Sequence, residues 1–316
     1  MKKRITILIP AYNEESVLPE LRKRLEALDH TITKYDLEFL FVNDGSRDNT
    51  MELIRDWAEI DERVSYVNLA RNFGKELAMM AGFDHIKTDA TIIIDADLQD
   101  PPELIPDMIK LWEKGYHDVY ARRRSRAGES WLKKTTSKLY YGVLQSSTHI
   151  PIQRDTGDFR LLDQRCIEAL TQIRESERNA KALFSWIGYK KKEILYDRDP
   201  RAAGSTKWSY PQLVNLALNG ITSFTTAPLR LATIFGLLFS MAAFTYLIVI
   251  VVRGLLGIVG VPGYSSLMAV ILFLGGVQLL SLGVIGEYIG RIFNETKNRP
   301  LYIVEEYHNG STKKTS

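Results

Sequence analysis

The sequence predicts an α/β fold with a doubly wound, mostly parallel sheet, followed by interfacial amphipathic helices and a two-helix transmembrane hairpin. Three observations carry this prediction. Strand and helix patterns alternate over residues 1–120. Polar side chains follow the predicted strands, where the ligands of such sheets bind. Residues 231–252 and 254–286 contain no charged residue.

The elements of the sheet are predicted from short apolar runs and helical periodicity. The Asp48-Asn49-Thr50 segment is typical of a helix start. Strands that alternate with helices favour a parallel arrangement. The expected strands are residues 5–9, 37–42, 64–69 and 91–94, and the helices between them are residues 14–28, 48–60 and 75–86.

The charge-free residues near the C-terminus are long enough to cross a membrane. A bilayer core of ~30 Å needs ~20 apolar helical residues, which predicts spans at 230–252 and 265–287. Two buried core helices are the alternative. The average composition, 45% hydrophobic, conceals this segregation. We therefore expect a catalytic domain at 1–208, an interfacial helix and linker at 209–229, the hairpin at 230–287 and a C-terminal tail at 288–316.

The orientation of the hairpin is predicted from its flanking charges. Residues 5–9 form too short an apolar run for a secretory signal peptide. Basic residues lie before and after the two spans, whereas Arg253 alone lies near the loop between them. The positive-inside rule then favours a multi-pass membrane protein, with the large N-terminal domain and both termini in the cytoplasm.

Composition and missing motifs exclude several function classes. Lys+Arg 41 against Asp+Glu 38 gives a net charge of +3, which does not argue for nucleic acid. The single cysteine, Cys166, cannot form an internal disulfide. Neither the glycine fingerprint of nicotinamide enzymes nor a P-loop is present, so dehydrogenase and P-loop NTPase functions are unsupported.

Two carboxylates follow the last predicted strand. Asp95 and Asp97 are separated by one residue after the apolar run 92–94, so both approach one point as the chain leaves the sheet. Such hard oxygen ligands suit Mg²⁺ or Mn²⁺ together with phosphate oxygens. A solvated turn with two acids is the alternative.

With these motifs the chain resembles the family 2 glycosyltransferases of GT-A fold. Within that family it resembles the polyprenyl-phosphate glycosyltransferases, the group of dolichyl-phosphate mannose synthase and the bactoprenol glucosyltransferases. The resemblance covers essentially the whole chain. It rests on the segments 9–15 (IPAYNEE), 42–50 (VNDGSRDNT), 71–75 (RNFGK), 95–103 (DADLQDPPE) and 154–161 (RDTGDFRL).

The resemblance implies roles on the donor side. Asp44 is expected to accept from the uracil imide, and its alternative is a helix-capping turn. Simple packing is the alternative for Tyr12. The residues implied for the nucleotide are Pro10, Ala11, Tyr12, Glu14, Asp44 and Asp95, and those implied for Mg²⁺ or Mn²⁺ are Asp97, Gln99 and Asp95.

Two basic segments are candidates for phosphate binding. Residues 122–138 combine seven cations with an apolar face, which is typical of a helix in a membrane interface. By resemblance, Arg122, Lys133, Lys134 and Ser137 would bind the acceptor phosphate, and the alternative is a solvated basic face. A second amphipathic helix is expected at 210–225. In segment 199–208, Arg201, Ser205 and Lys207 would contact the nucleotide diphosphate, and an ordinary linker is the alternative.

The reaction implied is an inverting transfer of a sugar, with glucose as the leading candidate, from a UDP-sugar to undecaprenyl phosphate. Asp97, Asp158 and Arg160 are the expected catalytic residues, with Asp158 acting as a base or orienting Arg160 and the acceptor. UDP-N-acetylglucosamine and GDP-mannose are the alternative donors. A processive polysaccharide synthase and a non-catalytic membrane scaffold are the competing functions. Gly286 and Gly290 permit close helix approach, which favours self-association. The resemblance to the bacterial members of the group implies a homo-oligomer, such as a tetramer, in the bacterial cytoplasmic membrane.

Overall fold

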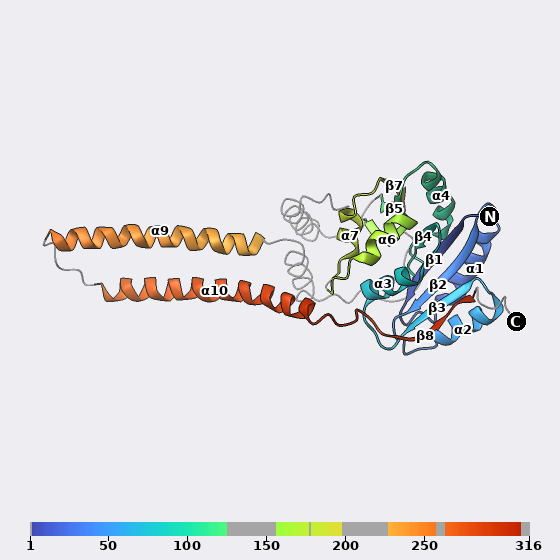
Figure 1. The fold of residues 1–316 in the computed structure, drawn as a ribbon, viewed down its shortest axis with the longest axis horizontal. Coiled ribbons are helices and arrows are strands. Elements are labelled where there is room, and N and C mark those ends of the chain that lie inside the picture. Colours follow the sequence, from blue (N-terminus) through green and yellow to red (C-terminus); the bar gives the residue numbers. More distant parts are fainter. Residues whose placement is uncertain (1, 125–155, 177, 198–226, 257–262, 311–316) are drawn as a thin grey trace. The chain divides into compact units, whose positions relative to one another are not determined.

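The computed structural model describes residues 2–124, 156–176, 178–197, 227–256 and 263–310 (Figure 1). The chain divides into two compact units. One contains Met1–Tyr141, Ile150–Trp208 and Pro300–Ser316, and the other contains Gly142–His149 and Ser209–Arg299.

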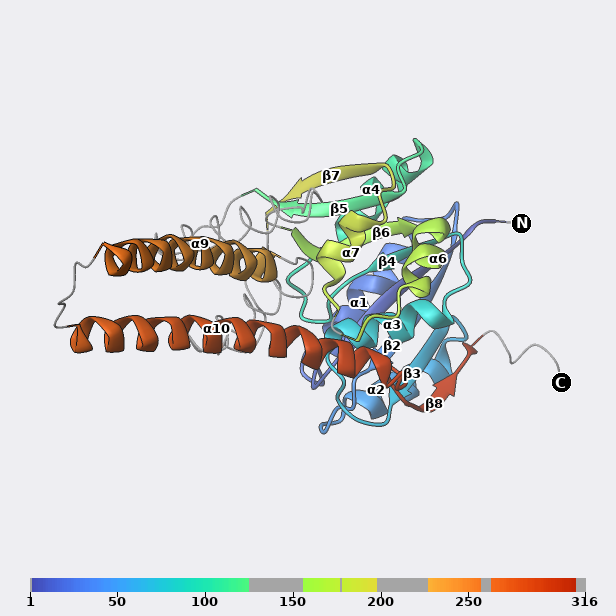
Figure 2. The ribbon, with the colours of Figure 1, turned by 60° about the vertical axis from the view of Figure 1, so that its left-hand side comes forward.

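The first unit is built on one eight-stranded sheet of order β7-β5-β6-β4-β1-β2-β3-β8 (Figure 2). The centre, β4-β1-β2-β3, is parallel, whereas β6 and β8 run antiparallel to their neighbours. The strands are β1 (Arg4–Ala11), β2 (Asp36–Asn43), β3 (Val64–Leu69), β4 (Ala90–Ile93), β5 (Asp118–Arg123), β6 (Thr156–Asp163), β7 (Lys191–Tyr196) and β8 (Val304–His308).

Helices cover both faces of this sheet, as expected for a doubly wound fold. The helices of this unit are α1 (Leu18–Asp29), α2 (Thr50–Ile60), α3 (Lys75–His85), the 3₁₀ helix η1 (Pro102–Leu104), α4 (Ile105–Glu113), α6 (Gln164–Gln172) and α7 (Ala180–Trp186). Apolar side chains of α1, α2 and α4 form the main core with Ile5, Ile7 and Ile9 of β1. Leu8 points the other way, and a Cβ added to Gly82 of α3 would lie 2.3 Å from it.

The predicted fold class is confirmed, and the predicted strands coincide with β1 to β4 within one residue at most ends. The first helix begins at Leu18 rather than at residue 14. Residues 14–17 form a turn instead, in which Glu14 O accepts hydrogen bonds from Val17 N and Leu18 N. The antiparallel strands β6 and β8 make the sheet mixed at its sides, which strand–helix alternation alone does not reveal.

The second unit contains two long helices, α9 (Ala227–Leu255) and α10 (Tyr264–Thr296). They include the two predicted spans, although α10 runs nine residues beyond residue 287. Phe239 of α9 and Phe273 of α10 pack edge to face at 5.1 Å. Within the described residues, Leu267–Thr296 is long and apolar enough to cross a membrane, and Leu231–Tyr246 is a shorter apolar helix.

The C-terminal residues differ from the expected tail. Val304–His308 forms β8 and pairs antiparallel with β3 at one edge of the sheet (Figure 1). Five residues that include two glutamates carry little strand signal, and their partner lies more than 230 positions earlier. The sequence pattern of these residues therefore predicts a tail and not a strand.

Candidate active site

The predicted donor-site residues converge at one edge of the sheet. The segments after β1, β2 and β4 carry Tyr12, Asp44 and Asp95, because the carboxyl ends of parallel strands meet at the same edge. The antiparallel strand β6 brings Asp158 to this edge, since Arg160 pairs with Ile93 at the end of β4. Polar residues from elements far apart in the sequence thus lie at the same edge of the sheet.

The loop after β1 is held in a defined shape by hydrogen bonds to the loop after β2. Asn13 has a positive φ of 56°. Its amide N–H donates to Ser46 Oγ at 2.9 Å, and its Oδ1 accepts from Arg47 N at 2.8 Å. The neighbouring residue Tyr12 is 42% exposed, so it is not a packed core residue. It is available to contact a ligand.

Asp44 is buried and supports the loop that precedes α3. Its carboxylate accepts hydrogen bonds from Phe73 N at 2.7 Å and Gly74 N at 2.9 Å. Burial raises the pKa of Asp44, while these two hydrogen bonds act in the opposite direction. Both donors directly precede α3, so Asp44 supports the start of a helix, and its expected contact with the uracil imide stays a prediction. An ionised carboxylate has about four acceptor positions, so each oxygen retains acceptor capacity beyond these contacts.

Lys75, which is not among the predicted site residues, joins two acids of the site. Lys75 Nζ lies 2.6 Å from Asp95 Oδ1 and 2.5 Å from Asp158 Oδ2. Burial alone would raise the pKa of the Asp158 carboxyl. The ammonium of Lys75 outweighs this effect and holds that pKa below its usual range. The sequence feature that could have identified Lys75 is its position directly after Gly74, at the start of α3.

Asp97 and Gln99 offer the donor set expected for a hard divalent cation. Gln99 N donates to Asp97 Oδ1 at 3.2 Å, which fixes the tight turn after β4. Carboxylate and amide oxygens are the ligands that Mg²⁺ and Mn²⁺ prefer, with waters and phosphates completing the shell. No cluster of three or more His, Cys, Asp or Glu that could hold a metal exists among the described residues. A cation held by these two side chains would have coordination positions left for phosphate oxygens and waters.

Arg160 lies inside the domain rather than at the surface of the site. Its side chain is 0% exposed, pairs with Asp118 at 3.2 Å and stacks on the Phe184 ring at 3.8 Å. Residues two apart in a strand share a face of the sheet. Arg160 nevertheless lies two residues further along β6 than Asp158, away from the edge that carries the site. The structure thus gives Arg160 a buried, supporting position, and its expected catalytic role stays a prediction.

Arg122 lies at the end of β5, where it forms an ion pair with Glu193 of β7 at 2.7 Å and remains 43% exposed. Pro10 and Ala11 end β1, and Glu14 begins the turn that follows. The other predicted phosphate contacts lie outside the described residues, as does the helix expected at 210–225. These contacts are Lys133, Lys134, Ser137, Arg201, Ser205 and Lys207.

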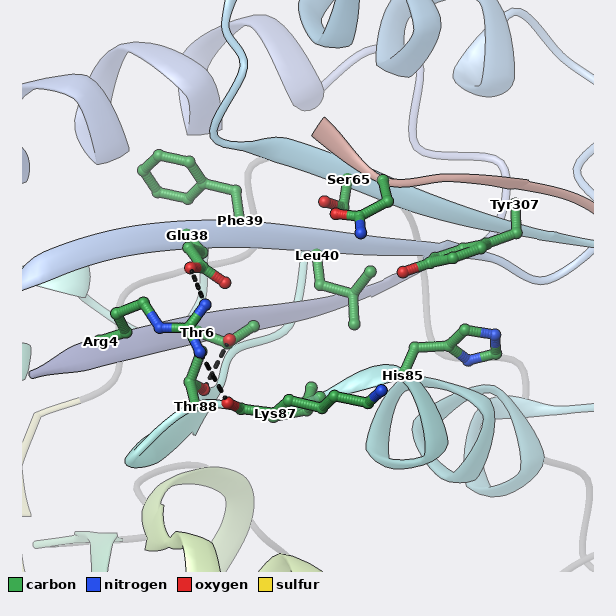
Figure 3. Close-up of a pocket in the computed structure, with 12 residues that line it drawn as sticks. Arg4, Thr6, Glu38, Phe39, Leu40, Ser65, His85, Lys87, Thr88 and Tyr307 are labelled. Carbon is green, nitrogen blue, oxygen red and sulfur yellow. Dashed lines mark hydrogen bonds and ion pairs between the residues drawn. The ribbon is translucent and has the colours of Figure 1, made fainter. Parts of the chain in front are cut away.

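A cavity of about 200 Å³ lies at the opposite, amino-terminal ends of the central strands (Figure 3). Arg4 donates to Glu38 and to the Lys87 carbonyl, both at 3.1 Å, and Thr6 and Thr88 bond each other at 2.8 Å. Several polar groups that line the cavity are thus bonded to one another. The acids, the lysine and the exposed tyrosine all lie at the other edge, which is the candidate active site.

Comparison with known proteins identifies the family of the chain. The model of glycosyl transferase family 2 matches residues 6–171, which include Asp44, Asp95, Asp97 and Asp158. The chain belongs to glycosyltransferase family 2. A second family model, the GtrB C-terminal hairpin, matches residues 227–292, which include most of α9 and α10. This family 2 enzyme therefore combines a GT-A-like sheet with a C-terminal helical hairpin.

Several relatives share nearly the whole length of the chain. It is 48% identical to an uncharacterized glycosyltransferase of Synechocystis sp., over 96% of this chain and 95% of the relative. It is 41% identical to the SfII prophage-derived bactoprenol glucosyl transferase of Shigella flexneri, over 98% and 99%. It is 40% identical to the prophage bactoprenol glucosyl transferase homolog of Escherichia coli, over 96% and 98%. These relatives therefore match both the sheet and the hairpin of this chain.

Proposed function

We propose that this protein transfers glucose from UDP-glucose to undecaprenyl phosphate, giving a polyprenyl-phosphate-linked glucose and UDP. The observation that carries the proposal is the 41% identity, over 98% of the chain, to a bactoprenol glucosyl transferase. The arrangement of Tyr12, Asp44, Asp95 and Asp158 at one edge of the sheet supports it. The donor is expected to lie along this edge.

The reaction proposed is a single displacement with inversion. An oxygen of the acceptor phosphate forms a bond to the anomeric carbon as the bond to the β-phosphate of UDP breaks. A phosphate monoester has a second pKa of ~6 and is largely dianionic at neutral pH. The nucleophile therefore needs little help from a base, and what the protein must supply is positioning and charge.

Lys75 and Asp158 are the residues best placed to give that help. Asp158 is held ionised beside Lys75, and a carboxylate of low pKa is a weak base. We therefore propose that Asp158 orients reacting groups and that Lys75 offers positive charge to a phosphate. At Asp97 and Gln99, with Asp95 beside them, we expect Mg²⁺ or Mn²⁺, whose charge would offset that of the leaving diphosphate.

The acceptor is proposed to reach the site from the membrane. The GtrB-type hairpin match and the apolar stretch Leu267–Thr296 support a membrane-associated enzyme. We propose two spans, with the catalytic domain and both termini on the cytoplasmic side. Arg122, Lys133, Lys134 and Ser137 remain the proposed acceptor-phosphate residues, and Arg201, Ser205 and Lys207 the proposed diphosphate contacts. A homo-oligomer, such as a tetramer, also remains a prediction, which light scattering of the detergent-purified protein would test.

A donor panel tests the proposed function. Full-length protein in detergent is incubated with undecaprenyl phosphate and labelled UDP-glucose, UDP-N-acetylglucosamine or GDP-mannose, and lipid-extractable label is measured. We expect label from UDP-glucose at a rate at least tenfold above the other two. Label from another donor alone would overturn the sugar assignment. No lipid label from any donor would overturn the function.

A further inference from the structure

The chain that follows the second hairpin helix returns to the catalytic sheet. β8 pairs with β3 in a register that sets Tyr66 opposite His308 and Val67 opposite Tyr307 (Figure 1). Just before β8, Ile303 O accepts a hydrogen bond from Ala70 N at 3.0 Å. The Tyr307 ring packs against His85 at the end of α3, 4.6 Å between centroids (Figure 3). This strand thus closes one edge of the sheet.

A continuous line of hydrogen bonds leads from β8 to the loop that carries Tyr12. Asn68 Nδ2 donates to Glu305 Oε2 at 3.0 Å, and Asn43 Nδ2 donates to Asn68 Oδ1 at 2.7 Å. The next two links are Ser46 Oγ to Asn43 Oδ1 at 2.5 Å and Asn13 N to Ser46 Oγ at 2.9 Å. We call this line, Glu305–Asn68–Asn43–Ser46–Asn13, the relay. Its two middle asparagines are buried.

The chemistry of the relay gives it a direction. A carboxylate only accepts hydrogen bonds, so Glu305 requires the amide nitrogen of Asn68 to face it. The Asn68 oxygen then faces the amide nitrogen of Asn43. The Asn43 oxygen in turn faces the Ser46 hydroxyl. Hydrogen bonds in such chains polarise one another and strengthen the whole. At the other end of the relay Ser46 N also donates to Asn43 Oδ1, at 3.4 Å. Glu305 therefore fixes the orientation of Asn68, and the two ends of the relay favour the same orientation of both buried amides.

A second connection reaches Asp44 from the same segment. Ile303 fixes Ala70, and the next residues of that loop donate from Phe73 and Gly74 to the Asp44 carboxylate. The loop also packs closely on Gly45, where an added Cβ would lie 2.4 Å from Arg71 C. Both loops of the proposed nucleotide site are thus supported by the residues that follow the hairpin.

We propose that β8 helps to shape the donor site and that Glu305 is a positioning residue for the loops after β1 and β2, which are expected to bind the nucleotide. This inference rests on the proposed function only in that the site binds a uridine nucleotide. Glu305 does not contact the donor. It holds Asn68, and through Asn43 and Ser46 it fixes the backbone of Asn13 beside Tyr12.

The neighbouring Glu306 provides a matched control. It lies in the same strand, but its carboxylate pairs with Arg55 Nη2 at 2.5 Å and accepts from the Tyr66 hydroxyl at 2.7 Å. It has no part in the relay. Removing the Glu306 carboxylate therefore loosens β8 to a comparable extent without changing the amides of Asn68 and Asn43.

The test compares UDP binding to full-length protein in detergent by calorimetry, together with the KM for UDP-glucose and the melting temperature. For E305A we expect a tenfold higher Kd for UDP and a matching rise in KM, with kcat within threefold of wild type. E305Q, whose amide oxygen still accepts, should stay within threefold in Kd. E306A should lower the melting temperature as much as E305A but leave the Kd within twofold.

Equal effects of E305A and E306A on the Kd for UDP would overturn the inference, because they would indicate general loosening of β8. An unchanged Kd in E305A would overturn it as well. UDP binding does not require sugar transfer, so wild-type protein that binds UDP but transfers no glucose overturns the proposed function while the relay is still tested. Wild-type protein that binds no UDP overturns both.

Discussion

Lys75 Nζ lies 2.5 Å from an oxygen of Asp158, so an ion pair joins the start of α3 to the start of β6 at the candidate active site. The same ammonium contacts Asp95 after β4. One cation thus holds two carboxylates that would otherwise repel each other. This arrangement places a positive charge where two phosphate-bearing substrates are proposed to meet.

Removal of the Lys75 charge should impair turnover more than folding. For Lys75→Met we expect kcat to fall about 100-fold, the size typical for loss of one group that stabilises developing charge. Lys75→Arg should retain more activity because it keeps the charge. Lys110→Met is the matched control, since Lys110 pairs with Asp107 on an exposed helix face and should stay within twofold. Equal losses in the two methionine variants would contradict a specific role.

Asp158→Asn separates orientation from base catalysis. Because the pKa of Asp158 is held low, we expect the amide, which can still accept from Lys75, to lower kcat only about tenfold. Steady-state kinetics at saturating UDP-glucose and acceptor measures this. A loss beyond about 1,000-fold with an unchanged KM would instead indicate that Asp158 is the base.

Asp97→Ala should abolish metal-dependent turnover. We expect EDTA to stop the wild-type reaction and added Mg²⁺ or Mn²⁺ to restore it, whereas the variant should stay inactive at metal concentrations that saturate the wild type. Asp107→Ala removes an exposed carboxylate outside the site and should respond to metal as the wild type does. Full activity of the Asp97 variant at ordinary metal concentrations would rule out the metal assignment.

Glu76 makes stability depend on pH in a defined direction. Burial, and then the charge of Asp158, raise the pKa of Glu76 from 4.5 to about 7. The stability that it contributes is therefore complete below about pH 4.5 and is lost as the pH rises through 7. Glu76→Gln keeps an acceptor for Ala180 N and cannot ionise. Its melting temperature relative to wild type should increase from pH 5 to pH 8. A constant difference over this range would disprove the assignment.

The buried pair of Arg160 and Asp118 should matter for stability. Both side chains are 0% exposed, and removing Arg160 leaves Asp118 with the more distant Lys191, whose Nζ lies 3.6 Å from Asp118 Oδ2. For Arg160→Met we expect a loss of about 3–5 kcal/mol in the free energy of unfolding. Arg122→Met breaks a half-exposed pair and should cost less than about 1 kcal/mol. Denaturant unfolding measures both, and equal losses would argue against the buried role.

The alternation of strands and helices and the polar residues after each strand were predictable from the sequence, because both follow from local patterns. Three features were not. Lys75 joins Asp95 and Asp158 only once α3, β4 and β6 are assembled. Arg160 follows Asp158 by two residues, and only the strand register shows that it lies deeper in the sheet. Residues 304–308 become a strand only through pairing with a distant partner.

The central claim is that sugar transfer to a polyprenyl phosphate occurs at this edge of the sheet. Its most direct test measures UDP release and lipid-extractable label together, from labelled UDP-glucose and full-length protein, with and without undecaprenyl phosphate. We predict equal molar amounts of UDP and glucolipid that depend on the acceptor, and neither product from Asp97→Ala. UDP release that is independent of the acceptor, without lipid label, would contradict the account.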